Sequence, residues 1–305
     1  MTDVEYYISL LNEDTFVIYL FHGVIEKSDY EVRNYSRKHL EKDEFYSLIK
    51  GLKSRGCALT MDEIVDNHRI NKKCPKYSYA ITFDDGFENN FSVAAPMLSD
   101  LNIPAIFYVS TELIQNNSMT WTDKVEYCIE QLDSGLLLID WLPNPIAFNN
   151  KRSKIEFMEL LRNTVKMNVE INTEELVENI YNQCDIDPIV ESENPLDKKM
   201  SWQQVQTLHE EPRFTVGGHS HRHVNLAFLD NGQLEYEISE SISLLKEKGS
   251  ISTCHYAYPE GLEYCFSDKV IEKLRKYGIV CCPTAIEGVN NNVTDLFHLR
   301  RFFVV

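Results

Sequence analysis

Short apolar runs alternate along this chain with stretches whose apolar residues recur every three or four positions. The apolar runs, which are typical of buried strands, lie at 16–22, 77–85, 105–110, 214–220, 253–259 and 277–285. Helical periodicity is found between several of them, at 43–54, 91–101, 234–248 and 267–277. Strands that alternate with helices predict a parallel sheet, and a chain of 305 residues is long enough for a barrel.

The stretch from 115 to 197 interrupts this alternation and is too long for an unstructured connection. Phe157, Leu161 and Val165 fall on one helical face. A second helical face, behind Thr173 as its N-cap, is formed by Leu176, Val177, Ile180, Tyr181 and Cys184. We therefore expect a single domain over 1–305 with a helical insertion at 115–197. Two roles are equally open for the insertion: a lid that only completes the core, or a substrate wall that sets specificity.

Composition indicates a folded protein, and its charge excludes some partners. With 43% hydrophobic residues the chain can bury a core. It has 30 basic and 47 acidic side chains, a formal net charge of -17, which disfavours nucleic acid and anionic membrane surfaces as partners. No run approaches the roughly 18 apolar residues of a membrane span, and residues 1–7 do not resemble a secretory signal. If the chain begins at its natural start, we expect a cytoplasmic protein whose eight cysteines are buried thiols rather than bridges.

Two adjacent acids follow the second apolar run. Ile81, Thr82 and Phe83 lead directly into Asp84, Asp85 and Gly86. Because neighbouring strand residues point to opposite faces, two adjacent acids can share a pocket only where the chain turns, and glycine permits that turn. Both acids could bind a metal, or one could bind it while the other moves a proton. An isolated Asp-Asp-Gly is more often an ordinary turn.

A histidine pair supplies what the two acids lack. His219 and His223 lie four residues apart, one helical turn, after an apolar run and a glycine pair. One oxygen ligand and two imidazoles leave a divalent transition metal with open positions for water and substrate, which predicts a hydrolytic site. A His-x-His-x-His run alone could bind metal by accident, so the prediction depends on both motifs together.

These motifs resemble those of the polysaccharide deacetylases of the NodB-homology type, carbohydrate esterase family 4. The segment 82–86, Thr-Phe-Asp-Asp-Gly, is similar to the first family motif, and 219–223, His-Ser-His-Arg-His, is similar to the His-(Ser/Thr)-x-x-His motif. Residues 101–110 look like the family strand after the first motif, and 200–202 look like the segment before the histidines. The likeness covers most of the chain outside about 115–197. It implies an α/β fold, a distorted (β/α) barrel whose catalytic residues lie at the C-terminal ends of strands.

The resemblance implies a division of roles among the motif residues. Asp85, His219 and His223 would hold a divalent metal, with Zn2+ the leading candidate and Ni2+, Co2+ or Fe2+ as alternatives. Asp84 would act as the general base that accepts the proton of the attacking water.

The general acid is expected near the N-terminus. Many family members carry a Leu-x-His motif near the C-terminus, whereas a permuted subgroup carries it on the first strand, and Leu20-Phe21-His22 resembles the permuted arrangement. The segment that ends in His298 also spells Leu-x-His, but residues 299–302 beside it look like the C-terminal Leu-Pro-Arg segment of the permuted subgroup. We therefore assign the acid to His22 and keep His298 as the weaker alternative.

The third family motif is altered in this chain. Tyr256 stands where other members have an arginine that orients the base, and Arg301 could approach from the C-terminal strand in its place. Glu260 stands where a tyrosine is common, and its negative charge would favour an amino or otherwise cationic product. His221 and His255 are spare imidazoles, which we expect to support the ligands or contact the substrate rather than bind the metal.

Several aromatic and charged residues are candidate substrate contacts. They are Tyr258, Glu260, Trp121, Trp202 and Arg301. Trp121 begins a Trp-Thr-Asp segment that resembles the Trp-Trp-Asp segment of family members with such insertions, and it is either a sugar-stacking platform or part of the core.

The leading hypothesis is a metal-dependent amidohydrolase that removes an acetyl, or a formyl, group from an amino sugar. Its substrate would be an intracellular precursor of a surface polysaccharide, such as O-antigen or exopolysaccharide, in a nucleotide-linked, lipid-linked or oligosaccharide form. Two alternatives stay open: a carbohydrate-binding protein that keeps the fold without turnover, and an O-acyl esterase. The intact set of two acids and two histidines favours an enzyme.

Overall fold

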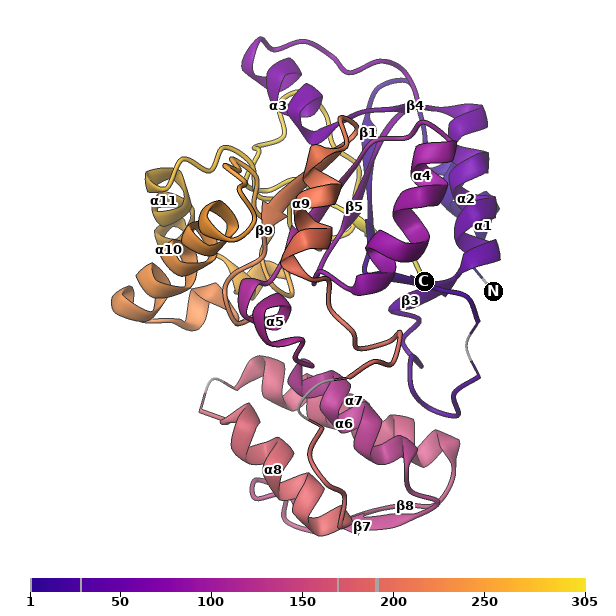
Figure 1. Cartoon of the computed structure of the whole chain (residues 1–305), viewed down its shortest axis with the longest axis vertical. Helices are drawn as coiled ribbons and strands as arrows, with labels where there is room; N and C mark the ends of the chain where they lie inside the picture. Colours follow the sequence, from indigo (N-terminus) through magenta and orange to yellow (C-terminus); the bar gives the residue numbers. More distant parts are fainter. Residues whose placement is uncertain (1, 28, 169, 190–191) are drawn as a thin grey trace.

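The largest sheet of this protein joins β10, β1, β5, β6 and β9 in that order, with β4 beside β5 (Figure 1). The computed structural model describes residues 2–27, 29–168, 170–189 and 192–305. The strands of this sheet are β1 (Phe16–Phe21), β4 (Cys57–Ala58), β5 (Ser78–Phe83), β6 (Ala105–Val109), β9 (Phe214–Gly218) and β10 (Phe302–Phe303). Every pair in it is parallel, which confirms the prediction from the alternating pattern. The strands β1, β5 and β6 are buried along their whole length, as expected for a parallel sheet covered on both faces.

Helices follow most of the strands and cover the sheet. They are α1 (Val4–Ser9), α2 (Lys42–Arg55), α3 (Met61–Arg69), α4 (Ala95–Asp100), α5 (Thr111–Asn116), α9 (Trp202–Glu210), α10 (Asn231–Glu247) and α11 (Asp268–Lys276), with short turns η1 (Asn90–Ala94), η2 (Leu226–Phe228) and η3 (Glu263–Cys265). The helices expected at 43–54, 234–248 and 267–277 are confirmed as α2, α10 and α11. The helix expected at 91–101 is a π turn, η1, that continues into α4.

The runs 253–259 and 277–285 are not regular strands, so these two predictions are wrong in detail. Isolated parallel bridges join Gly218 to Tyr256 and His255 to Cys281. Beyond these bridges, backbone hydrogen bonds join the segment around Cys282 to the next segment of the chain, from Cys282 N to Leu296 O at 3.0 Å and from Thr284 N to Leu299 O at 2.8 Å. Prolines at 259 and 283 lack the N–H that a longer ladder needs, which explains why the pairing stays short.

The segment 115–197 folds around a hydrophobic core of its own. It contains α6 (Trp121–Glu130), α7 (Lys151–Met167), α8 (Thr173–Cys184) and an antiparallel pair, β7 (Gly135–Leu137) and β8 (Ile146–Phe148). These elements lie together below the sheet in Figure 1, with α5 between them and the sheet. Their core contains the predicted helical faces, including Phe157 and Leu161 of α7 and Ile180 of α8. The β7–β8 pair was not predicted, and the N-cap of α8 is Asn172, one residue earlier than expected.

A second, smaller sheet has two short strands near the N-terminal end of the chain. Its parallel strands are β2 (Gly23–Ile25), directly after β1, and β3 (His39–Glu41). Among the helices within the described ranges, none has both the length and the apolar character needed to span a membrane.

Candidate functional site

The predicted site residues lie at the C-terminal ends of strands of the main sheet. Asp84 and Asp85 follow β5, His219 follows β9, and His22 follows β1. The backbone of Asp85 has a left-handed φ of 73°, and that of His223 has a φ of 57°. Left-handed backbone is unfavourable for residues other than glycine, and such strain is concentrated at functional sites. The chain therefore turns sharply within the first motif and at the end of the second.

The glycine pair before His219 has a steric reason. A Cβ atom on Gly218 would lie 2.4 Å from the ring of Tyr256, and one on Gly217 would lie 2.6 Å from the ring of Tyr108. The two tyrosine rings therefore pack directly on the end of β9. Ser110 Oγ donates to the carbonyl of His219 at 2.7 Å, which holds the imidazole at this edge.

A buried glutamate holds the rest of the histidine motif in place. Glu237 of α10, which is fully buried, accepts hydrogen bonds from the backbone N–H groups of His221 and Arg222 at 3.0 Å each. The side chain of His221 is bonded instead to Thr111, with 2.9 Å between Nδ1 and Oγ1. His221 thus supports the loop, as expected of a spare imidazole.

Asp85, His219 and His223 converge in a way that fits a metal ion. One ligand atom from each lies within 4.8 Å of the others. Asp85 Oδ1 is 3.1 Å from His223 Nε2 and 3.5 Å from His219 Nε2. Yet this buried oxygen accepts no hydrogen bond, so the imidazoles are near it without being directed at it. An orphaned carboxylate oxygen between two imidazole nitrogens is the donor set of a divalent transition metal.

The second nitrogen of His219 has the partner that metal-binding histidines usually have. His219 Nδ1 lies 3.0 Å from the backbone carbonyl of Ala257. Since a carbonyl can only accept, Nδ1 carries the proton and Nε2 is free to act as a ligand.

Burial lowers the pKa of His223, but the nearby carboxylates of Asp85 and Glu260 outweigh it and raise that pKa.

Asp84 lies beside this cluster but has a different partner, Arg301. Arg301 donates to both carboxylate oxygens of Asp84, with 2.8 Å for each bond. The fully buried guanidinium also donates to Thr82 Oγ1 at 3.2 Å and to the carbonyl of Thr284 at 2.6 Å. Burial raises the pKa of Asp84, but the charges of Arg301 and His219 outweigh it and lower that pKa, so the carboxylate is ionised. Arg301 thus contacts Asp84, the proposed base. The side chain is fully buried and has no exposed surface that could contact a sugar, contrary to its prediction as a substrate contact.

His22 lies at the end of β1 with one nitrogen unused. Its Nδ1 is buried and has no hydrogen-bond partner, and its ring packs edge-on against Phe303. Burial lowers the pKa of His22 to about 4, with Asp85 opposing and Lys38 adding to this effect. The imidazole is therefore neutral at pH 7 in the free protein. His298, the weaker alternative, is half-exposed and bonds to Asp295.

A lysine that sequence reasoning missed lies against Asp85, in the cluster with His219 and His223. Lys38 Nζ is 3.2 Å from Asp85 Oδ2 and 3.2 Å from Asp123 Oδ1, and it lies 4.7 Å from the centre of the Phe87 ring. Burial lowers the pKa of Lys38, but Asp123 and Asp85 outweigh it and raise that pKa. Asp123 belongs to the Trp-Thr-Asp segment of α6. The segment 115–197 therefore reaches the site through Asp123, the last residue of the Trp-Thr-Asp segment, to which the sequence pattern assigned no separate role.

The predicted substrate contacts have different surroundings. Tyr258 is fully buried and donates its hydroxyl to the carbonyl of Phe297 at 3.2 Å, so this side chain has no surface to offer a sugar. Trp121 is partly buried and packs on the core of segment 115–197. Trp202 packs on the main core and donates Nε1 to Gln115 at 3.0 Å.

Glu260 is the predicted contact that lies beside the catalytic cluster. It forms an ion pair with Lys166 of α7, and its backbone has a left-handed φ of 61°. Burial raises the pKa of Glu260, but Lys166 and His223 outweigh it and lower that pKa. Glu260 therefore connects segment 115–197 to the side of the site that carries His223.

Glu126 of α6 should make the stability of the protein depend on pH. Its carboxylate accepts the backbone N–H of Asn34 at 3.1 Å, and burial together with Asp123 raises its pKa to about 7. An acid whose pKa is raised in the folded state loses stability as pH rises from its ordinary range through that value. Glu126→Gln should therefore raise the free energy of unfolding by about 1–2 kcal/mol at pH 8 and by less at pH 6. Denaturant titrations at both pH values check this, with exposed Glu159→Gln as the control that should gain nothing; an equal gain at both values would contradict it.

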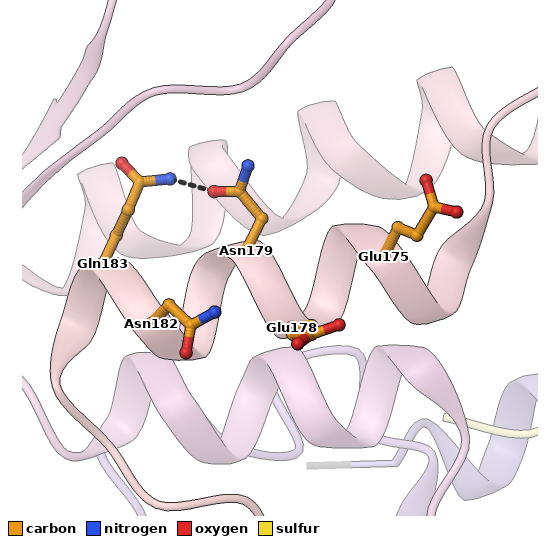
Figure 2. A pocket seen from close by; sticks show the side chains of 5 residues that line it. All are labelled: Glu175, Glu178, Asn179, Asn182 and Gln183. Atoms are coloured by element: carbon orange, nitrogen blue, oxygen red, sulfur yellow. Dashed lines mark hydrogen bonds between the residues drawn. The ribbon is translucent and has the colours of Figure 1, made fainter.

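A hollow elsewhere on the surface does not have this chemistry. Figure 2 shows that its lining side chains all come from α8, where Gln183 donates to Asn179. The lining residues are Glu175, Glu178, Asn179, Asn182 and Gln183. None of the predicted site residues is among them.

Comparison with known proteins agrees with the fold and the motifs. A family model described as polysaccharide deacetylase matches residues 71–282, more than half of the chain. The match includes the Asp84–Asp85 pair and both proposed histidine ligands, whereas His22 and Arg301 lie outside it. A search of curated proteins finds no match.

Three solved structures show the same fold at low identity. A Streptococcus pyogenes deacetylase, PplD, in complex with acetate is 14% identical, with 96% of this chain and 93% of that chain covered and a TM-score of 0.61. IcaB from Ammonifex degensii is 17% identical, with 97% and 94% covered and a TM-score of 0.59. The BpsB deacetylase domain from Bordetella bronchiseptica is 15% identical, with 96% and 97% covered and a TM-score of 0.54. The α/β fold of the NodB type is thus confirmed, and the chain belongs to the polysaccharide deacetylase family.

Proposed function

We propose that this protein is a metal-dependent carbohydrate deacylase that removes an N-acetyl or N-formyl group from an amino sugar. Membership of the polysaccharide deacetylase family supports a deacetylase acting on a carbohydrate. The observation that carries the finer proposal is the orphaned Oδ1 of Asp85 between His219 and His223, beside an Asp84 that has a separate cationic partner. Because the two adjacent acids have different partners, we assign them different roles.

The metal would be held by Asp85, His219 and His223. When bound, a divalent ion such as Zn2+ would polarise the amide carbonyl and make a water molecule more acidic. Lys38 offsets the negative charge that Asp85 and Asp123 bring to the same place.

Asp84 would act as the general base. Its carboxylate is ionised, and the two bonds from Arg301 fix its orientation. Asp84 Oδ2 is 3.9 Å from His219 Nε2, so the base lies next to a proposed ligand without being one. In this position it would accept the proton of the water that attacks the carbonyl carbon.

His22 would pass a proton to the nitrogen of the leaving sugar amine. Its unpartnered Nδ1 and the influence of Asp84 and Asp85 on its pKa support a position in the same pocket. Because burial lowers its pKa to about 4, His22 is neutral before the reaction; it would take up the proton that Asp84 removes from the water and pass it to the amine nitrogen as the C–N bond breaks. Glu260 lies near His223 and would favour the positively charged amine product.

A panel of acylated sugars tests this function. We expect acetate or formate release from at least one N-acyl amino sugar by the metal-loaded protein, and loss of that release on chelation. Release from O-acetyl sugars only would indicate an esterase instead. Bound metal with no release from any compound of the panel would support a carbohydrate-binding protein without turnover.

A further inference from the structure

A second group of metal-ligating side chains lies outside the deacetylase site. Asp62, in the first turn of α3, meets Cys254 and His255, and one ligand atom of each lies within 4.8 Å of the others. In Figure 1, α3 is at the end of the sheet opposite to α6, α7 and α8. The group is therefore distinct from Asp85, His219 and His223.

His255 is only half satisfied as a buried histidine. The side chain is 1% exposed, and its Nε2 lies 2.8 Å from Asp62 Oδ1. Its other nitrogen, Nδ1, is buried and has no hydrogen-bond partner. Burial lowers the pKa of this imidazole, but Asp62, together with the thiols of Cys254 and Cys281, outweighs it and raises that pKa to about 11, so two sulfur atoms lie beside the ring in addition to the carboxylate.

Cys254 supplies a soft ligand beside this imidazole. Contact with His255 lowers the pKa of the thiol, although burial raises it, and the thiolate is the form that binds metals. The thiol is half-buried, whereas the Asp62 side chain is 61% exposed. An ion could therefore enter from the solvent side, with His255 closing the site from within.

We propose that Asp62, Cys254 and His255 bind a second divalent transition metal, of the class that accepts sulfur, nitrogen and oxygen ligands, such as zinc. Three protein ligands leave a fourth position for water. The ion would join the start of α3 to the segment that supplies Ala257, the partner of His219. This site does not depend on the proposed deacylase function.

Cobalt provides a test that separates the two sites. A cobalt ion bound by a thiolate has a sulfur-to-metal charge-transfer absorption in the near ultraviolet, and the Asp85, His219 and His223 cluster contains no sulfur. Co2+ titrated into the full-length metal-free protein should produce this band. The band should disappear in Cys254→Ser, require at least tenfold more cobalt in Asp62→Asn, and persist in His223→Ala.

The controls make the result decisive. Cys57→Ser removes an exposed thiol and should keep the band. If Cys254→Ser fails to fold by circular dichroism, protection of Cys254 from alkylation by Co2+ in the wild-type protein gives the same information. No band at stoichiometric cobalt, a band that persists in Cys254→Ser, or no protection would each overturn the proposal and leave only an ion pair between Asp62 and His255.

Discussion

Replacing Asp84 with asparagine is expected to reduce deacylation by about 10²–10⁴-fold while the protein keeps its metal. Asparagine has the same shape but cannot accept the proton of the attacking water. The proposed ligands Asp85, His219 and His223 are unchanged, and Asp84 Oδ2 is 3.9 Å from the nearer imidazole. Metal content measured by elemental analysis and initial rates of acetate release check both parts of this expectation.

The neighbouring Asp85→Asn variant is the matched control, because it makes the same chemical change one residue away. It should lose both metal and activity, since Asp85 is the proposed oxygen ligand of the metal. Equal metal loss in the two variants would refute the division of roles. Thermal unfolding of both should accompany the assays, because Asp84→Asn leaves the charge of Arg301 buried without its partner.

Replacing Arg301 with glutamine is expected to destabilise the protein by about 3–5 kcal/mol and to remove most of its activity. Arg301 is fully buried, and its two bonds to Asp84 compensate the desolvation of both charges. Without Arg301 the buried carboxylate has no compensating charge, so burial would raise the pKa of Asp84. Asp84 would also lose the two hydrogen bonds that orient it as a base. Chemical denaturation gives the stability change, and the pH dependence of kcat/KM reports the raised pKa of Asp84.

Arg300 offers a matched control for this variant. It is exposed and donates to the carbonyl of Glu287 at 3.0 Å, so Arg300→Gln should change stability and activity little. An Arg301→Gln protein with wild-type stability and an unchanged pH profile would show that this arginine does not hold the base.

The parts of the site that the sequence predicted are those carried by local motifs. Asp84, Asp85, His219 and His223 each follow a strand that could be recognised from its own apolar run. Because parallel strands end at the same edge of a sheet, these residues had to come together once the strands were placed. The two helical faces in segment 115–197 were predicted for the same reason, since periodicity is a local property.

The parts that were missed depend on contacts between distant segments. Lys38 is in the N-terminal part of the chain and Asp123 is in α6, and neither has a local pattern that indicates the other. Tyr258 was a candidate substrate contact as an aromatic residue near Glu260, but the fold buries it with its hydroxyl bonded to the backbone of Phe297. The strands expected at 253–259 and 277–285 were overestimated because their apolar composition outweighed the prolines that end them.

The position of the metal in crystals of the zinc-loaded protein with an amino-sugar product tests the central claim most directly. The account predicts a strong anomalous signal at about 2.0–2.2 Å from one oxygen of Asp85 and one nitrogen each of His219 and His223. It also predicts that Asp84 remains bonded to Arg301 and is not a ligand. A metal ion held by Asp84 instead of Asp85, or bound away from both histidines, would contradict it.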